Sequence, residues 1–427
     1  MKAKKLISAA MALVLVCGAP VVFYERPLNE IKTSALEYRT DTYEGLFSYH
    51  KYSDHVEVYM AVDATNLETI VIPSKIEGLP VTDINNSAFS RCKSLTSITL
   101  PESITIIGDS AFLGCISLTS ITVPNSVVTI GERAFSGCTS LNSITIPDSV
   151  ATIGKYTFSG CSSLTSITIP NSVTAIGEWT FSNCTGLTAI KISDNATIIG
   201  NYAFQDCKNL MSITLPDSVT TVGEWAFSGC TSLNSITISK NVTTIGGSAF
   251  SDCTGLTSIT LPDSVTTIRD WVFKGCKGLK SITISDNATT IGYSMFYGCT
   301  GLTSVTIPES VTSVKDNAFV GCTNLTSLVI KNPKCELSAT MTGYILPFTI
   351  YGYADSTAQA YALSKGMEFK LLDDESQTEE PTSAPSAGKA DVNGDGKADA
   401  SDASDILRYY AHISTGGNLS FEEFIKK

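Results

Sequence analysis

The sequence predicts a β-rich repeat solenoid of short parallel strands joined by helical turns, followed by a small helical, EF-hand-like calcium module. A 23-residue segment recurs eleven times, and its Phe-x-x-Cys pair keeps this spacing from Phe89/Cys92 to Phe319/Cys322. A period of this length is typical of a solenoid, because one unit is too small to bury its own apolar side and stacks on its neighbours. The calcium module is indicated by alternating oxygen-bearing residues over 391–402.

Residues 1–23 have the features of a secretory signal. Lysines at the start precede an apolar core, Leu6–Val16, which is the pattern that such signals require. Two alternatives stay open, an uncleaved membrane anchor and a lipid-modified Cys17, although Val16 stands where a lipoprotein has a small residue. No other stretch is long and apolar enough to span a bilayer. The mature chain is therefore predicted to be secreted, without a membrane span, and to start with a lead segment over residues 24–40.

Residues 41–80 are expected to form an N-terminal cap and the first repeat strand. Apolar and polar residues alternate over Leu46–Val62, which indicates a hairpin with its turn near residues 53–54. A cap is needed because the first rung of a solenoid exposes unpaired backbone groups. His50 and His55 flank the expected turn and are interpreted as exposed polar residues.

Each repeat between residues 81 and 330 begins with a short strand. In the first complete copy, Leu95, Ile98 and Leu100 are expected to point inward, and the Ser and Thr residues between them outward. Pro101 ends the strand because proline cannot donate a hydrogen bond to a β-ladder. Successive strands are expected to pair in parallel along the solenoid.

The second half of each repeat is expected to be a shorter extended run and then a helical turn. In the first copy these are residues 104–108 and a turn that ends at Cys115. The Gly that opens the turn is replaced by Arg269 and Lys315 in two later copies, so a positive φ is not expected there.

The chain has 13 cysteines, and eleven of them share one position of the repeat. Adjacent rungs lie about 4.8 Å apart, and parallel Cβ vectors at this distance do not suit a disulfide. We therefore expect buried free thiols that pack as small apolar groups. Cys17 and Cys335 lie outside the repeat.

One turn position, two residues after the Gly, is rich in aromatic residues and is the candidate ligand-binding stripe. Its members are Tyr156, Trp179, Tyr202, Trp225 and Trp271, which include all three tryptophans of the chain. Three interpretations stay open: a structural stacking ladder, a protein-binding surface, and a platform for a plant cell-wall polysaccharide. The third rests on alternate rungs being roughly 10 Å apart, which is similar to the two-sugar repeat of a β-1,4-glucan.

The sequence offers no candidate for catalysis. It has three histidines and lacks the His-Glu-x-x-His, Gly-x-Ser-x-Gly and phosphate-loop motifs. A net charge of −12 without a basic stripe argues against nucleic-acid binding. We therefore expect a binding protein and not an enzyme.

Beyond the repeats the pattern changes twice. Residues 331–372 are expected to form a C-terminal cap with a short helix over Ser356–Lys365. Residues 373–389 are acidic and then rich in Pro, Ser and Ala, which is typical of a flexible linker. The last segment, residues 390–427, contains the calcium loop.

The calcium loop has oxygen side chains at positions 1, 3, 5, 9 and 12, a Gly at position 6, and a backbone carbonyl at position 7. A hard cation such as Ca²⁺ needs six or more oxygens, and a tight turn brings them together. The candidate ligands are Asp391, Asn393, Asp395, Lys397, Asp399 and Asp402. Asp402 stands where such loops usually have a bidentate Glu.

Two parts of the chain resemble known families. The repeats, such as SLTSITIPNSVTAIGEWTFSNC (163–184), are similar to the leucine-rich repeats of BspA-like bacterial surface proteins. This resemblance covers about residues 67–330. It implies a leucine-rich-repeat fold and a secreted role in binding or adhesion, without catalysis.

The tail resembles a type I dockerin. The resemblance is carried by the segment DVNGDGKADASDASDILRYY (391–410) and by the ending after Ser414. The resemblance implies Ca²⁺-dependent docking to a cohesin domain on a cellulosomal scaffoldin at the cell surface. The residues implied for the cohesin face are Ala400, Ser401, Ile406, Leu407 and Tyr410. Dockerins carry two calcium loops and this chain has one, so the alternative is a free or cell-surface adhesin whose calcium module does not bind cohesin.

Overall fold

The structure is a computed structural model that describes residues 39–61, 67–343 and 348–372. The chain divides into two compact units, Met1–Phe369 and Lys370–Lys427, and only residues 370–372 of the second are described. The expected signal, linker and helical calcium module lie outside the described residues, as does nearly all of the lead segment.

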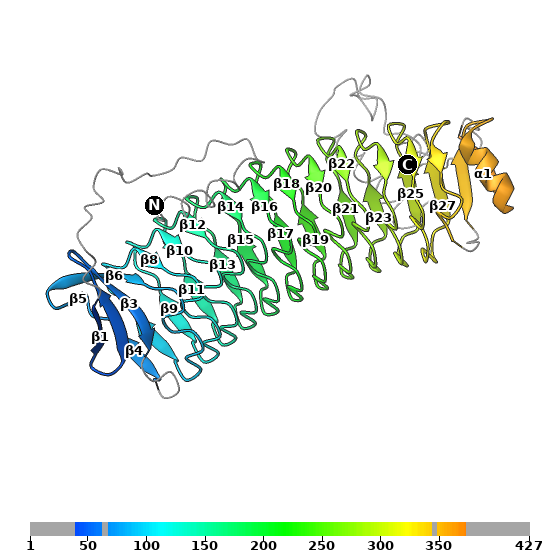
Figure 1. Ribbon diagram of the computed structural model, residues 1–427. Coiled ribbons are helices and arrows are strands. Elements are labelled where there is room, and N and C mark those ends of the chain that lie inside the picture. The colour runs from blue at the N-terminus through cyan, green and yellow to red at the C-terminus, as the bar shows by residue number, and fades with distance from the viewer. Residues whose placement is uncertain (1–38, 62–66, 344–347, 373–427) are drawn as a thin grey trace, which may run out of the picture. The chain divides into compact units, whose positions relative to one another are not determined.

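The first unit is a solenoid of about 13 stacked turns, whose strands lie side by side in Figure 1. One row of strands comes from the Ser-Ile-Thr segments, in which Ile is inward and its neighbours are exposed. This confirms the predicted alternation. The strands of this row are β4 (Thr69–Val71), β7 (Ser97–Thr99), β9 (Ser120–Thr122), β11 (Ser143–Thr145), β13 (Ser166–Thr168), β15 (Ala189–Lys191), β17 (Ser212–Thr214), β19 (Ser235–Thr237), β21 (Ser258–Thr260), β23 (Ser281–Thr283), β25 (Ser304–Ile307) and β27 (Ser327–Ile330).

A second row of two-residue strands forms another side of the solenoid. Pairs in this row are parallel, as between β10 and β12 (Thr129↔Thr152), because every rung follows the same course. The strands are β8 (Ile106–Ile107), β10 (Thr129–Ile130), β12 (Thr152–Ile153), β14 (Ala175–Ile176), β16 (Ile198–Ile199), β18 (Thr221–Val222), β20 (Thr244–Ile245), β22 (Thr267–Ile268), β24 (Thr290–Ile291), β26 (Ser313–Val314) and β28 (Glu336–Leu337).

The interior is built from equivalent side chains that stack from rung to rung. The repeat phenylalanines from Phe89 to Phe319 are fully buried, and their rings stack with centroids 5.2 to 5.8 Å apart. The cysteines that follow them are buried and free, as expected. From Cys115 to Cys322, each thiol donates a hydrogen bond to a phenylalanine carbonyl of the preceding rung, as Cys184 Sγ does to the Phe158 oxygen (3.1 Å).

The connection after the second strand is a run of tight turns, and the expectation of helical turns was wrong. In this segment Cys115 N–H donates to the Phe112 carbonyl three residues earlier, whereas Phe112 N–H donates to the Ala134 carbonyl of the next rung (2.8 Å). This alternation continues along the turn. An α-helix would direct every N–H along its own axis, and none would then remain to join neighbouring rungs.

In most rungs the Gly that opens the turn is favoured by close contact between rungs, although Arg269 and Lys315 occupy this position in two of them. A Cβ added at Gly154 would lie 2.4 Å from the Glu132 backbone nitrogen of the preceding rung. Gly154 does not have a positive φ, which agrees with the expectation from the sequence. The positive φ occurs two residues later, at the position of the aromatic stripe.

The N-terminal end is covered by a sheet of β1 (Arg39–Tyr43), β2 (Phe47–Lys51) and β3 (Val56–Ala61) (Figure 1, blue). The hairpin between β2 and β3 confirms the predicted turn, in which Tyr52 N–H donates to the His55 carbonyl (2.9 Å). Strand β1 begins within the segment expected to be an unpatterned lead. Strand β3 then pairs in parallel with β6 (Leu79–Ile84), which also pairs with β5 (Lys75–Ile76).

The C-terminal end contains α1 (Thr357–Lys365), close to the predicted bounds. Its N-cap is Ser356, whose hydroxyl accepts from Gln359 N–H, and Gly366 ends it in the left-handed conformation. The strands on either side of the helix are β29 (Thr349–Gly352) and β30 (Phe369–Leu371).

Candidate functional site

The aromatic stripe lies on the turn side of the solenoid. All residues at this position, aromatic or not, have a left-handed backbone with φ between 50° and 60°. This conformation is uncommon for a bulky side chain and costs about 1–2 kcal/mol. The backbone alternation of the turn imposes it, since the N–H at this position donates to the next rung, as Trp179 does to the Asn201 carbonyl (3.0 Å).

Four members of the stripe form a continuous stacked ladder. The centroid of Trp179 lies 5.6 Å from that of Tyr156 and 3.9 Å from that of Tyr202, with the rings nearly parallel. Trp225 continues the ladder at 6.2 Å from Tyr202, and the Arg133 guanidinium covers the other end, 4.5 Å from the Tyr156 centroid. Each ring between the ends has neighbours over both faces. A sugar ring stacks on an aromatic face, so this geometry favours the structural-ladder interpretation for these four residues.

Trp271 belongs to the stripe by position but not to the ladder. The equivalent residues of the neighbouring rungs, Ser248 and Ser294, are small and buried. Among the described residues no aromatic ring stacks on Trp271, which is 46% exposed. The sequence pattern grouped five residues that the structure separates into four stacked rings and one exposed ring.

Two tyrosines on the next rung complete an exposed aromatic patch, which we define as Trp271, Tyr293 and Tyr297. Tyr293 is 45% and Tyr297 43% exposed. Trp271 N–H donates to the Tyr293 carbonyl (2.9 Å), so the two rungs are directly joined at this point. Neither tyrosine was predicted from the sequence, because both lie at other positions of the repeat. The available signal was a tyrosine at two turn positions where the copies from residue 109 to residue 320 carry no other aromatic residue.

The aromatic patch has a basic rim in a chain of net charge −12. Arg269, Lys274 and Lys277 come from the same rung as Trp271, and all three are exposed. None of them forms an ion pair with a described residue. The patch therefore combines uncovered aromatic rings with positive charge.

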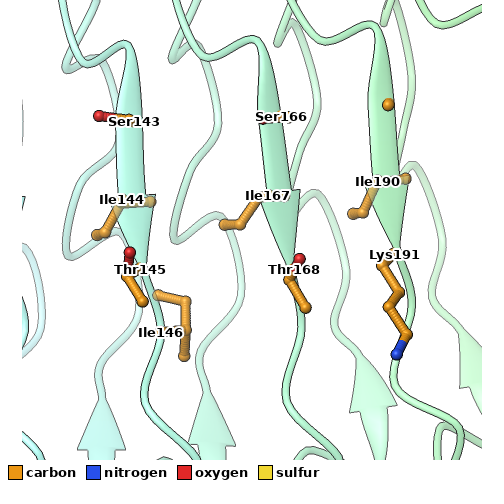
Figure 2. Close-up of a pocket in the computed structure, with 10 residues that line it drawn as sticks. Ser143, Ile144, Thr145, Ile146, Ser166, Ile167, Thr168, Ile190 and Lys191 are labelled. Carbon is orange, nitrogen blue, oxygen red and sulfur yellow. The ribbon is translucent and has the colours of Figure 1, made fainter.

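The strand side offers a second, more polar surface. A groove of about 610 Å³ lies over β11, β13 and β15, lined by Ser, Thr and Ile side chains and by Lys191, which are drawn in Figure 2. It lies where hydrogen bonding between β11 and β13 is interrupted. Similar grooves of about 370 and 320 Å³ lie over β15/β17 and β19/β21. These grooves offer hydroxyl groups but no aromatic ring.

The buried thiols from Cys138 to Cys322 are held neutral. Burial raises the pKa of Cys138 and Cys184 to about 12, because a thiolate would lose its hydration. These thiols lack the lowered pKa of a nucleophilic cysteine. They are therefore structural groups.

The interpretation of His50 as an exposed residue was wrong. Its side chain is 3% exposed and stacks on Tyr59, with ring centroids 4.2 Å apart. Burial lowers the pKa of His50, since the imidazolium would be poorly solvated. His55 is half-buried beside Asp54 and Glu57. Alternation alone could not distinguish the two faces of β2, because the first four residues of this strand are all buried.

The predicted calcium ligands from Asp391 to Asp402 and the predicted cohesin-contacting residues, Ala400, Ser401, Ile406, Leu407 and Tyr410, lie outside the described residues. They stay predictions from the sequence. Within the described part of the chain, no helix has the length and apolar character needed to cross a membrane.

Comparison with known proteins identifies the repeats. The profile of the BspA type leucine rich repeat region, built from six copies, matches residues 82–211 and 197–326. A leucine-rich repeat protein of Bacteroides ovatus is similar over 78% of this chain and 98% of its own, with 26% identity and a TM-score of 0.60. A leucine rich cell surface protein of Faecalibacterium prausnitzii is similar over 77% and 98%, with 29% identity and a TM-score of 0.52.

No curated protein matches the sequence. The two profile matches together span residues 82–326, which is more than half of the 427 residues. The solved structures have the same repeat fold over nearly their full length. The chain belongs to the BspA type leucine-rich repeat family.

Proposed function

We propose that the protein is a secreted, non-catalytic binding or adhesion protein that engages a protein ligand through the aromatic patch. The observation that carries this proposal is the exposure of Trp271, Tyr293 and Tyr297 on two joined rungs. Trp and Tyr dominate the energetic centres of protein interfaces, because they bury a large area and lose few rotamers on binding. In the ladder, by contrast, the same residue types already cover each other.

The basic rim indicates the charge of the ligand. Arg269, Lys274 and Lys277 are exposed on the same rung as Trp271, whereas the chain as a whole is acidic. Opposite charge at the edge of an interface speeds association and selects among partners. We therefore expect an acidic protein surface as the ligand, and weaker binding as the salt concentration rises.

A location outside the cell follows from the N-terminal signal pattern over residues 1–23 and from the family. The similar F. prausnitzii protein is described as a cell surface protein. The tail adds a second element of the proposal: Ca²⁺ bound by Asp391, Asn393, Asp395, Lys397, Asp399 and Asp402 would fold it for docking to a cohesin of a scaffoldin. The alternative is a free or surface-held adhesin whose single calcium loop does not bind cohesin.

The ligand proposal is tested with the immobilised full-length chain and a panel of purified extracellular proteins of graded isoelectric point. Wild type is compared with Trp271→Ala/Tyr297→Ala and with a control variant, Val71→Ser/Met211→Ser, that removes exposed apolar groups elsewhere. Loss of a hot-spot residue costs about 2 kcal/mol or more, which is roughly a 30-fold weaker Kd. We expect this loss only in the patch variant and only for acidic members of the panel.

Insoluble cellulose and xylan form a parallel arm of the same experiment. Binding of acidic proteins that is equal in wild type and the patch variant would contradict the proposal. Retention on a polysaccharide that disappears in the patch variant, without any bound protein, would replace the protein ligand by a glycan. Circular dichroism confirms that each variant is folded.

The tail is tested separately by calorimetric titration of Ca²⁺ into the full-length chain. We expect one bound Ca²⁺, and its loss in Asp395→Ala, because a carboxylate at position 5 of the loop is a direct ligand. A cohesin domain added with and without Ca²⁺ distinguishes the scaffold-docked protein from the free adhesin.

A further inference from the structure

Three side chains with metal-ligating atoms meet where the N-terminal cap joins the solenoid. One nitrogen of His55 and one carboxylate oxygen each of Glu57 and Asp83 lie within 4.8 Å of one another. All three residues are half-buried. This cluster is far in sequence from the predicted calcium loop and from the aromatic patch.

The backbone places these residues together. Glu57 of β3 and Asp83 of β6 are Cα partners in a parallel pair, and the register shifts between Val56 and Glu57. Such bulges change the direction of a side chain and are frequent near functional sites. His55 is fixed at the end of the preceding hairpin turn, where its carbonyl accepts from Tyr52 N–H (2.9 Å).

The imidazole of His55 is oriented by two contacts. Its Nδ1 lies 2.7 Å from Asp54 Oδ1, so the N–H at Nδ1 donates to that carboxylate and Nε2 is left as the ligand atom. The Tyr52 ring stacks on the imidazole at 4.5 Å, with 4° between the planes. A carboxylate that holds the second nitrogen is the usual arrangement around a metal-bound histidine.

The two carboxylates are oriented as well. Glu57 Oε2 accepts from Asn85 Nδ2 (2.8 Å) and from the Tyr52 hydroxyl (3.3 Å), which directs Oε1 toward His55 Nε2, 3.5 Å away. Asp83 Oδ2 accepts from the Thr82 hydroxyl (2.5 Å). Each carboxylate is thus held through one oxygen by an uncharged donor.

We propose that His55, Glu57 and Asp83 bind a divalent transition-metal ion of the Zn²⁺ class. Ligand bonds of about 2.0–2.2 Å in a tetrahedral site place ligand atoms about 3.4 Å apart, and the separation of His55 Nε2 and Glu57 Oε1, 3.5 Å, is close to this value. Two carboxylates balance the charge of the ion, and the imidazole selects Zn²⁺ over Ca²⁺, which takes oxygen ligands. The ion would join the cap hairpin to strand β6 of the solenoid.

The test uses the full-length chain, freed of metal by a chelator and kept in a non-coordinating reductant with saturating Ca²⁺. Co²⁺ serves as the spectroscopic probe and Zn²⁺ as its competitor. We expect the protein to bind one equivalent of Co²⁺, which should show visible ligand-field bands and no sulfur-to-metal charge-transfer band near the ultraviolet. Zn²⁺ should displace the Co²⁺, and the Tm should be higher with the ion bound.

The variants His55→Ala and Asp83→Asn should each weaken binding at least tenfold. Glu57→Gln keeps an amide oxygen for Asn85 and Tyr52, and it therefore tests the ligand role with little effect on folding. Asp41→Asn in the same cap and His412→Ala are the matched controls, and they should bind as wild type does. Absence of binding, a thiolate signature, or equal affinity in the cluster variants and wild type would overturn the proposal.

Discussion

Trp179 and Trp271 show how one position of the repeat can serve two purposes. Both have a left-handed backbone, with φ of 59° and 58°. Trp179 has an aromatic ring on each face, whereas Trp271 lies between two small buried residues and is exposed. The left-handed backbone conformation costs the same free energy at both residues, so Trp179 and Trp271 differ only in their side-chain contacts.

Trp179→Ala is expected to lower the free energy of unfolding by about 1–3 kcal/mol, because two stacked pairs are worth about 0.5–1.5 kcal/mol each. Trp271→Ala should change it by less than about 0.5 kcal/mol, as is usual for an exposed residue. The shared φ makes each variant the control for the other. Urea unfolding of both variants measures the difference, and equal values would contradict the distinction between ladder and patch.

The buried thiols make stability depend on alkaline pH. The pKa of Cys184 is about 12 in the fold, against an ordinary value of 9.0. The folded value is raised, so this contribution is complete below pH 9 and is lost as the pH rises toward 12. The unfolded chain releases its proton first, and each such thiol lowers the free energy of unfolding by up to about 1.4 kcal/mol per pH unit in this range.

Cys184→Ala should therefore unfold with a shallower pH dependence than wild type between pH 9 and 10. Urea unfolding at pH 8, 9, 9.5 and 10 gives the two curves, and between pH 9 and 10 we expect the free energy of unfolding of wild type to fall by about 1 kcal/mol more than that of the variant. At pH 8 the variant differs only by the lost packing and thiol hydrogen bond. Parallel curves would show that the thiol is accessible to solvent in the fold.

At the scale of the elements, the row of two-residue strands is interrupted at two points, between β12 and β14 and between β22 and β24. The residue before the repeat phenylalanine is Ala in most copies, but it is Thr157, Thr180, Val272 and Met295 in the rungs on either side of the interruptions. All four are fully or almost fully buried. Two adjacent larger side chains occupy more space between the rungs, which separates the strands at these points.

Thr157→Ala/Thr180→Ala is therefore expected to restore the pairing of β12 with β14. In intact pairs the Gly after the second strand donates to the preceding rung, as Gly200 does to the Ile176 carbonyl (2.8 Å). We expect the Gly177 amide to gain this bond and to exchange its hydrogen at least tenfold more slowly. Hydrogen exchange followed by NMR or mass spectrometry tests this, with Gly200 as the internal reference. Unchanged exchange at Gly177 would exclude the packing explanation.

The repeat period predicted most of the fold, because one 23-residue pattern determines the inward residues, the two strands and the free cysteines of every rung. It could not predict the course of the turn. A sequence such as Ser110–Cys115 is compatible with a helical turn, and only hydrogen bonding to the next rung favours the alternating conformation. Strand β1 was missed because its pattern is short and polar, although only three residues separate it from its antiparallel partner β2.

The candidate site was predictable only in part. The sequence pointed to Trp271 through its repeat position, but exposure depends on the neighbouring rungs, where Ser248 and Ser294 leave its faces uncovered. Tyr293 and Tyr297 do not follow the repeat pattern, so the regular aromatic stripe does not predict them. The cluster of His55, Glu57 and Asp83 depends on pairing between β3 and β6, and a local sequence pattern does not predict this pairing.

At the scale of the whole solenoid, stability is the sum of contacts between neighbouring rungs. The phenylalanine spine carries much of it, since each inner ring stacks on two others, as Phe204 does on Phe181 and Phe227 (5.4 and 5.2 Å). Phe204→Ala should lower the free energy of unfolding by about 3–5 kcal/mol. Phe204→Leu keeps most of the volume and should cost less. Similar effects of the two variants in urea unfolding would argue against a packed spine.

The central claim is that the ladder stabilises the solenoid and the aromatic patch binds the ligand. The most direct test measures ligand affinity, on the extracellular protein panel, and stability in the same two variants, Trp179→Ala and Trp271→Ala. We predict that Trp271→Ala loses affinity roughly 30-fold with unchanged stability, and that Trp179→Ala loses stability with unchanged affinity. Loss of affinity in Trp179→Ala, with binding retained in Trp271→Ala, would place the ligand on the ladder and contradict the account.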